Sequence, residues 1–245
     1  NDSPPDPPPA SEVWPPERFE GVWHMDVSGM TIADSVADAH PAMAETDDAS
    51  AQSQRGIAGL AAEFDGNNDV HNAGDPQDGS LDAGNDSFTV SLWARVESNA
   101  GSYDTPLYKG AAQDFEPGYG FFFGALHPSL AGCIADDEDR QHLPYGPLDA
   151  LLGGWHHFVL TVNRERQTVT AYLDGVEVSE EGLMMEALDS DDALTFSDAT
   201  NPFRGLLDEI RVQRAAVDAA WVAAEWTNLA DRSAFFTVGP PETSP

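Results

Sequence analysis

Two turns between Gly154 and Val178 constrain the fold of this chain more than any other feature. Segments 155–162 and 168–173 are rich in β-branched and aromatic residues, and the polar run 164–167 separates them, as in paired strands. Asp174-Gly175 follows at once and supplies the two positive-φ residues that a type I′ hairpin turn needs. We therefore predict three consecutive antiparallel strands. Val159 is apolar, although its parity is opposite to that of Phe158, so the first of these strands should be covered on both faces.

The rest of the chain reads as further short strands and one helix. The alternation of Phe88, Val90, Leu92, Ala94 and Val96 with Thr89, Ser91, Trp93 and Arg95 is the cleanest half-buried pattern. Other strands are predicted at 19–26, 57–64, 107–109, 119–126, 194–196, 203–212 and 234–238, with a short one ending at Ile134. Gly29 to Ser53 is expected to be a long polar connection. Asp218 should cap a helix over 219–228.

This inventory predicts an all-β, two-sheet antiparallel sandwich in one domain over residues 19–238. Residues 1–18 and 239–245 are rich in proline and are expected to be a linker and a tail. The single Cys133 cannot form a disulfide within the chain, and no Cys/His spacing suits zinc. The Pro-rich start predicts a piece of a longer protein.

The charge of the chain limits its partners. Asp and Glu number 43 against 11 Lys and Arg, and the formal net charge is −32. Such a polyanion is not expected to bind nucleic acid or anionic membranes, and no apolar run is long enough for membrane insertion. Divalent cations and neutral or cationic ligands remain. The composition suits a secreted protein.

Five short motifs, in order, carry a family resemblance: Phe64-Asp65-Gly66, segment 88–93, segment 154–158, segment 172–175 and segment 203–212. Together they resemble bacterial laminin-G-like domains of the concanavalin A-like lectin/glucanase superfamily. The resemblance implies a jelly roll, usually a non-catalytic module of secreted or surface proteins. It also implies glycan or protein partners and, in some members, a calcium ion.

Calcium ligands are sought first at Asp208, which has the parity of Leu206, Ile210 and Val212. A carboxylate facing the core needs a metal, a cation or several hydrogen-bond donors, and backbone amides and calcium both remain open. Asp26 is the candidate co-ligand, because the resemblance implies that the two terminal strands are neighbours.

A second candidate calcium site is the loop with Asp65, Asn67 and Asp69. Its oxygens at i, i+2 and i+4 can wrap a hard cation, but the same residues are ordinary turn formers. The acidic runs 136–139 and 189–192 are interpreted as solvated loops. His156 and His157 are adjacent in a strand, so they cannot both bind one metal.

Ligand contacts are predicted at aromatic and cationic side chains. Trp93 beside Arg95 can stack on a sugar and donate to it, or a loop can cover that face. Tyr103, Tyr119 and Tyr145 are further candidates near loops. No pair of carboxylates on one strand face, no Gly-x-Ser-x-Gly and no phosphate-binding loop indicates an enzyme.

The sequence therefore predicts a secreted or cell-surface, non-catalytic module that binds a glycan or surface polymer, with a structural calcium ion. The alternative is a structural or assembly subunit that contacts other copies or neighbouring domains. A glycoside hydrolase ranks last.

Overall fold

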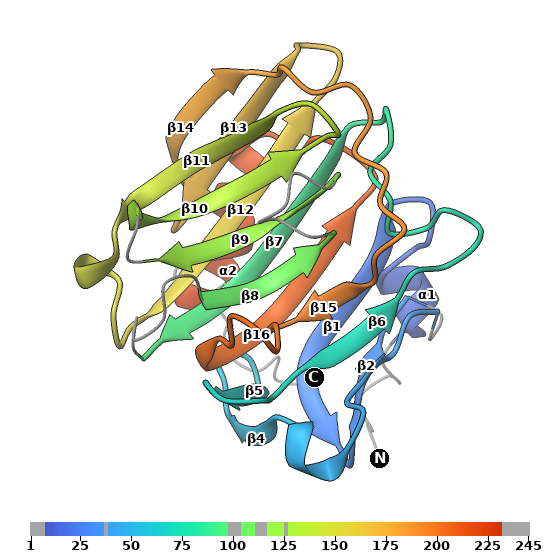
Figure 1. Cartoon of the computed structure of the whole chain (residues 1–245), viewed down its shortest axis with the longest axis vertical. Helices are drawn as coiled ribbons and strands as arrows, with labels where there is room; N and C mark the ends of the chain where they lie inside the picture. The colour runs from blue at the N-terminus through green and yellow to red at the C-terminus, as the bar shows by residue number, and fades with distance from the viewer. Residues whose placement is uncertain (1–7, 37–38, 98–103, 111–116, 125–126, 232–245) are drawn as a thin grey trace, which may run out of the picture.

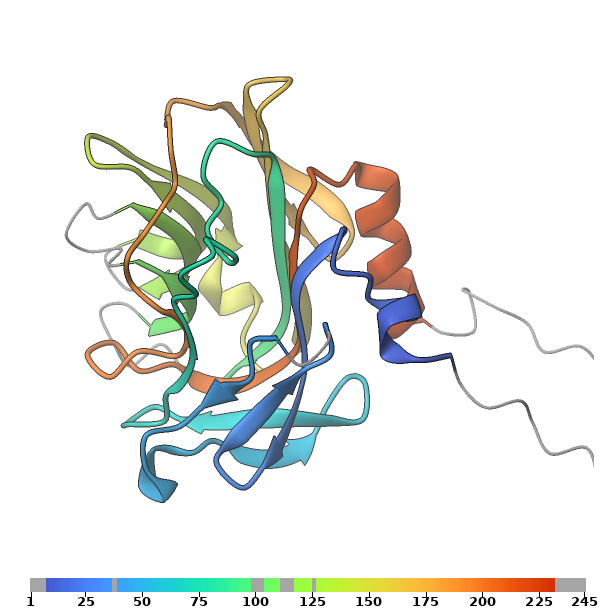
Figure 2. The same ribbon diagram turned by 90° about the vertical axis from the view of Figure 1, so that its right-hand side faces the viewer.

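The computed structural model describes residues 8–36, 39–97, 104–110, 117–124 and 127–231. Every strand pair is antiparallel, and the strands form two facing layers that are joined through one end of the molecule (Figures 1 and 2). The predicted all-β, jelly-roll sandwich is confirmed.

The first layer follows the order β11-β10-β9-β8-β15-β6. Its strands are β11 (Arg140–Pro147), β10 (His127–Ala135), β9 (Gly118–Gly124), β8 (Asp104–Lys109), β15 (Leu194–Phe196) and β6 (His71–Gly74). Two short strands, β3 (Ala42–Met43) and β2 (Thr31–Asp34), continue the hydrogen bonding from β6 to the second layer.

The second layer follows the order β1-β16-β7-β12-β13-β14. Its strands are β1 (Phe19–Ser28), β16 (Arg204–Gln213), β7 (Phe88–Val96), β12 (Trp155–Asn163), β13 (Thr168–Leu173) and β14 (Val176–Gly182). A hairpin of β4 (Gln52–Arg55) and β5 (Leu60–Asp65) pairs with the start of β16. Asp174 and Gly175 have φ of 51° and 81°, which confirms the predicted type I′ turn between β13 and β14.

The core lies between the two layers and is built from alternate residues of each strand. Phe158, Leu160 and Val162 of β12 belong to it, together with Phe121 and Phe123 of β9. Val159 instead packs on the outer face of the second layer against Val222 of α2 (Ala219–Ala230). Figure 2 shows α2 standing on this outer face, beside the short α1 (Ala10–Val13). The central strand is thus covered on both sides, as predicted.

Asp218 caps α2 by accepting a hydrogen bond from the Trp221 amide at 2.8 Å, as the sequence predicts. The helix buries Val222 completely, whereas Trp221 remains 37% exposed beneath Arg18. Short 3-10 turns at Asp47–Ala49 and Leu148–Ala150 complete the elements.

The structure corrects three parts of the predicted strand map. The polar connection from Gly29 to Ser53 contains β2, β3 and the start of β4. These short strands have too few apolar residues to be predicted from a hydrophobic pattern. The strand predicted from Ile57 begins at Leu60, because Gly56 to Gly59 form the turn of the β4–β5 hairpin. Strand β11 was not predicted. The strand predicted over 234–238 lies outside the described residues, as do residues 1–7 of the predicted linker and the whole tail. The described part of the linker contains the short helix α1.

Candidate functional site

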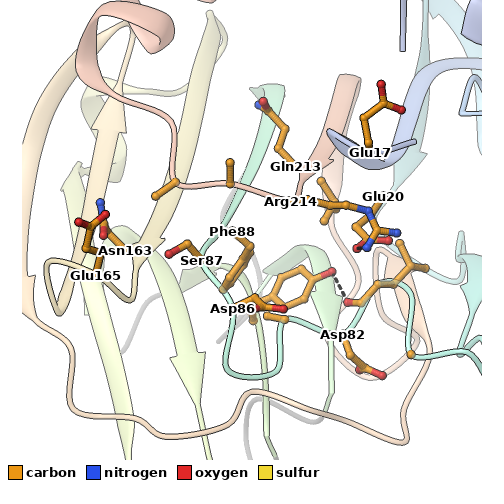
Figure 3. A pocket seen from close by; sticks show the side chains of 17 residues that line it. Glu17, Glu20, Asp82, Asp86, Ser87, Phe88, Asn163, Glu165, Gln213 and Arg214 are labelled. Carbon is orange, nitrogen blue, oxygen red and sulfur yellow. Dashed lines mark hydrogen bonds and ion pairs between the residues drawn. The ribbon is translucent and has the colours of Figure 1, made fainter. Parts of the chain in front are cut away.

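A pocket of about 760 Å³ opens at one rim of the sandwich, and we call it the rim pocket (Figure 3). Its lining comes from five separate parts of the chain. These are Glu17 with Glu20, residues 79, 81–83 and 86–88, Tyr119, Asn163 with Glu165, and segment 212–216. Figure 3 shows Glu165 and Asn163 on one side and Glu20 and Arg214 on the other, with Ser87 and Phe88 between them. The pocket therefore crosses the end of the second layer.

Buried polar contacts hold the loop that forms one wall of the rim pocket, residues 75–87. The Tyr119 hydroxyl donates to the Leu81 carbonyl at 2.8 Å, and the Arg164 Nη2 atom donates to the Gly84 carbonyl at 2.8 Å. Lys109 Nζ contacts Asp75 Oδ1 at 2.7 Å and Asp82 Oδ1 at 3.1 Å. Because several fixed groups hold the loop from the core side, the wall is formed before any ligand arrives.

Lys109 is the only lysine of the chain, and its side chain is fully buried. Besides the two carboxylates, its ammonium donates to the carbonyls of Ser190 and Asp192 at 2.9 and 2.7 Å. Four oxygens from two loops thus surround one positive charge. This arrangement compensates the cost of burying the ammonium and ties the pocket wall to the 190–192 loop.

Glu20 is the most buried carboxylate of the rim pocket, with 9% of its surface exposed. Its Oε1 atom pairs with Arg214 Nη1 at 2.6 Å. Its Oε2 atom is sealed from solvent. Burial raises the pKa of the Glu20 carboxyl, while Arg214 opposes the shift.

The aromatic ligand contacts predicted from sequence do not lie on the surface. Trp93 is 2% exposed and stacks on His157 with ring centroids 5.1 Å apart. Tyr145 is buried and donates to the Val159 carbonyl at 2.8 Å. These two predictions are wrong in this structure, because the outer face of β7 is covered and the Tyr145 ring belongs to the core.

The other predicted ligand contacts have different outcomes. Arg95 is partly exposed and pairs with Glu97 at 2.7 Å, away from the rim pocket. Tyr119 is fully buried, yet it forms part of the rim pocket lining. Tyr103 lies outside the described residues.

Asp208 is fully buried, but its predicted orientation toward the core is wrong. The register between β16 and β7 shifts after Asp208, and Glu209 takes a positive φ of 47°. This bulge changes the parity of the strand, so Leu207, Ile210 and Val212 belong to the core whereas Leu206 does not. Asp208 lies under the Gly56–Gly59 turn, where its Oδ2 atom accepts from the Ala58 amide at 3.0 Å and its Oδ1 atom from the Glu209 amide at 2.9 Å. Backbone donors, one of the two alternatives, therefore satisfy this carboxylate.

The remaining predicted calcium ligands are engaged as turn residues or are apart. Asp69 Oδ2 accepts from the Asp65 amide at 2.7 Å, and Asp65 Oδ1 accepts from the Asn67 amide at 2.8 Å, which is the ordinary chemistry of an Asx turn. Strands β1 and β16 are neighbours, as the resemblance implies, but Asp26 is exposed whereas Asp208 is sealed. Within the described ranges, no cluster of three or more His, Cys, Asp or Glu side chains could hold a metal ion. The described carboxylates thus do not fit a calcium ion.

A second cleft of about 500 Å³ lies between the 136–139 loop and segment 184–189. Asp136 there accepts from the amides of Glu138, Asp139 and Glu186. These bonds explain the lowered pKa of Asp136, against the opposing effect of its partial burial. The acidic loops thus serve as turns in solvent, as interpreted from the sequence.

The fold and the rim pocket define a jelly-roll module of lectin-like architecture. The family model of the concanavalin A-like lectin/glucanases superfamily, of the laminin-G type, matches residues 65–223. The chain belongs to this superfamily, which confirms the resemblance predicted from its motifs.

Solved structures with the same fold include two toxin binding domains and one domain of an arabinanase. The binding domain of Paraclostridial Mosquitocidal Protein 1 superposes with a TM-score of 0.71 at 15% identity, covering 88% of this chain and 53% of that one. The binding domain of botulinum neurotoxin serotype G gives 0.62 at 12% identity, covering 87% and 51%. Domain 4 of AbnA, an extracellular arabinanase of Geobacillus stearothermophilus, in complex with arabinotriose, gives 0.61 at 19% identity, covering 84% and 98%.

The chain thus spans about half the length of the two toxin domains and nearly all of the arabinanase domain. At these identities the likeness concerns the fold. A search of curated sequences gave no significant match. In the part of the chain that the structure describes, no helix is both long and apolar enough to cross a membrane.

Proposed function

We propose that this chain is a non-catalytic binding module of a secreted or cell-surface protein, and that it recognises a glycan through the rim pocket. The observation that carries the proposal is the pocket itself. Its volume of about 760 Å³ lies in the range of small-molecule sites, and its wall is held by buried contacts.

The lining of the rim pocket suits a polyhydroxylated ligand. Asn163 and Arg214 offer donors, and the carboxylates of Asp82, Asp86 and Glu165 offer acceptors. Phe88, of which 4% of the surface is exposed, adds a small apolar contact. A glycan needs this combination of donors, acceptors and apolar contact, because each hydroxyl that loses water must find a partner.

The comparisons also support a binding role. The named toxin structures are binding domains, and the arabinanase domain was solved with a bound arabinose oligomer. Transfer of a saccharide-binding role to this chain, and of an extracellular location, is part of the proposal. No step of it uses a metal ion.

The test is binding of the whole chain to an array of neutral, acidic and amine-bearing glycans, followed by calorimetry on the best binder. The double variant Asp86→Ala/Glu165→Ala alters two exposed side chains of the rim pocket. Its matched control is Asp137→Ala/Glu138→Ala, which removes two exposed carboxylates at the second cleft. We expect the rim double variant to lose at least tenfold in affinity and the control to retain binding.

An array without any binder would contradict the proposal. Equal losses in both double variants would contradict the rim location. Turnover of a bound polysaccharide that disappears with a carboxylate substitution would overturn the non-catalytic assignment.

A further inference from the structure

The segment before β1 is folded onto the domain, and we call residues 10–18 the strap. It comprises α1 and the Pro15-Pro16 pair, and it runs along the outer face of the second layer beside α2 (Figure 2). None of the residues of α1 is buried. The family model matches residues 65–223, so the strap lies outside the part of the chain that matches the superfamily.

One aromatic side chain anchors the strap to the sheet. Trp14 is half-buried, and the guanidinium carbon of Arg211 lies 4.9 Å from the centroid of its ring. The Phe19 ring meets the Trp14 ring edge to face, with centroids 5.2 Å apart. The Arg211 guanidinium is itself held by Glu209 at 2.7 Å and by Glu225 at 3.0 Å. Trp14 therefore packs on a cation whose position is fixed.

The other end of the strap forms a second wall of the rim pocket. The guanidinium carbon of Arg18 lies 5.1 Å from the centroid of the Trp221 ring on α2. The Arg214 Nε atom donates to the Pro16 carbonyl at 2.9 Å, and the Arg214 amide donates to the Arg18 carbonyl at 2.9 Å. Glu17 lies between these two carbonyls in the sequence and lines the pocket (Figure 3). Arg214 thus belongs both to the pocket and to the attachment of the strap.

The described contacts of the strap are few and lie near the surface. They are two cation–π pairs, two hydrogen bonds to Arg214 and the packing of the Trp14 ring. A segment with few buried contacts opens more readily than the sheet on which it lies. We therefore expect the strap to exchange between a docked and a released form while the sandwich stays folded.

Resting on the proposed glycan-binding function, we infer that the strap is a reversible wall of the rim pocket, and that a bound glycan and the docked strap stabilise each other. The coupling passes through Arg214, whose side chain is 45% exposed and pairs with Glu20. This guanidinium can also donate to a sugar oxygen. Release of the strap breaks its bond to Pro16 and removes Glu17 from the lining. By linkage, the factor by which docking raises glycan affinity is the factor by which the glycan favours docking.

Hydrogen exchange measures docking of the strap without any ligand. The Arg214 amide is bonded to the Arg18 carbonyl in the docked form, so its exchange rate reports release of the strap. Trp14→Ala should bring this rate close to that of an unbonded amide. Trp221→Ala removes the partner of Arg18 without changing the charge, and it should raise the rate at least twofold. The control Trp155→Ala removes a half-buried tryptophan of β12 and should leave the rate unchanged.

Calorimetry with the best-binding glycan of the array measures the coupling. Trp14, Trp221 and Trp155 do not line the rim pocket, so a loss of affinity in the first two variants would act through the strap. Trp14→Ala should weaken binding at least threefold, whereas Trp155→Ala should preserve it. In the wild type, saturating glycan should slow exchange of the Arg214 amide at least threefold. Thermal unfolding of each variant confirms that it is folded, and Trp221→Ala carries the test if Trp14→Ala proves unstable.

The outcomes separate this inference from the proposed function. An unchanged exchange rate at Arg214 in Trp14→Ala would overturn the docking role of Trp14 and the inference with it. A released strap with unchanged glycan affinity would overturn the coupling and leave glycan binding intact. An equal loss of affinity in Trp155→Ala would also overturn the coupling, by showing a general weakening of the fold. No binding of any glycan would overturn both the proposed function and the coupling, while the exchange rates would still decide whether Trp14 docks the strap.

Discussion

The Lys109 ammonium lies 2.7 Å from Asp75 Oδ1, inside a rim where no part of the lysine side chain reaches solvent. Asp82 and two backbone carbonyls complete the surroundings of this fully buried ammonium. The relationship joins β8 to the loop that forms the wall of the rim pocket. An internal positive charge therefore determines the shape of the proposed ligand site.

Replacing Lys109 by Met should leave the Asp75 and Asp82 carboxylates without their cation. We expect a loss of about 1.5–3 kcal/mol in the free energy of unfolding, because the carbonyls of Ser190 and Asp192 lose a charged hydrogen-bond donor. The Asp75 and Asp82 carboxylates are partly exposed, so water can replace part of their contact. Chemical denaturation measures the change. Arg166→Met removes an exposed cation and is the control, with an expected change below about 0.5 kcal/mol. Similar values for the two variants would contradict the structural role of Lys109.

Asp208 should make stability depend on pH. Burial raises the pKa of its carboxyl to about 7, above the unfolded value of about 3.9. The folded chain then holds a proton that the unfolded chain releases, so the free energy of unfolding falls as pH rises from about 4 to about 7. The upper limit of this contribution is about 4 kcal/mol.

The measurement is chemical denaturation of the wild type and Asp208→Asn across this pH window. The variant should show a smaller decline with pH. The slope that remains reports the general repulsion within a chain of net charge −32. Identical slopes would show that Asp208 does not hold a proton in the folded state.

Gly56 is required because Asp208 lies directly beneath it. A Cβ atom at Gly56 would stand in contact with Asp208 Oδ2 and 3.0 Å from the Ala61 Cβ atom. Gly56→Ala should therefore cost about 1–3 kcal/mol. The control is Gly182→Ala, at which a Cβ atom meets nothing within 4 Å. In an Asp208→Ala background the cost should shrink, because the clashing oxygen is gone. An unchanged cost in that background would exclude this clash as its cause.

The pKa values of two histidines should be shifted in opposite directions. Burial lowers the pKa of the His157 ring to about 3, whereas the hydrogen bond to Glu209 at 2.6 Å raises the pKa of His24 above its ordinary 6.5. Below about 6.5 the unfolded chain protonates His157 and the folded chain does not, so this residue destabilises the fold as pH falls. The contribution of His24 is present at low pH and is lost as pH rises through its raised pKa.

NMR titration of the ring nitrogens checks both directions. His157 should stay neutral down to about pH 4, while His24 should lose its proton above pH 6.5. A His157 resonance that titrates near 6.5 would contradict its burial against Trp93. A His24 resonance that titrates below 6.5 would contradict the strength of its contact with Glu209.

Local sequence patterns predicted the sandwich well where one face was apolar and the turn chemistry was strong. Strand β7 and the Asp174-Gly175 hairpin have the bounds that alternation and positive-φ residues indicate. The prediction for the orientation of Asp208 was wrong because the bulge at Glu209 changes the parity of β16. No residue type at this position indicates a bulge. The predicted exposure of Trp93 was wrong for a different reason, because segments distant in sequence cover its face of the sheet.

The rim pocket could not be predicted from spacing. Glu20, Ser87, Glu165 and Arg214 come from different strand ends, and only the closed topology brings them together. Of the candidate residues named from sequence, Tyr119 alone lines this pocket. Tyr119 was chosen because it is an aromatic residue near a loop, and many core residues have the same property.

The location of the bound saccharide tests the central claim most directly. Amide ¹H–¹⁵N spectra recorded while the best-binding glycan of the array is added report every perturbed backbone position. We predict that the largest shifts fall in segments 79–88, 163–165 and 212–216, the parts of the chain that line the rim pocket. Shifts concentrated instead at segments 136–139 and 184–189, or spread evenly over the acidic surface, would contradict the account.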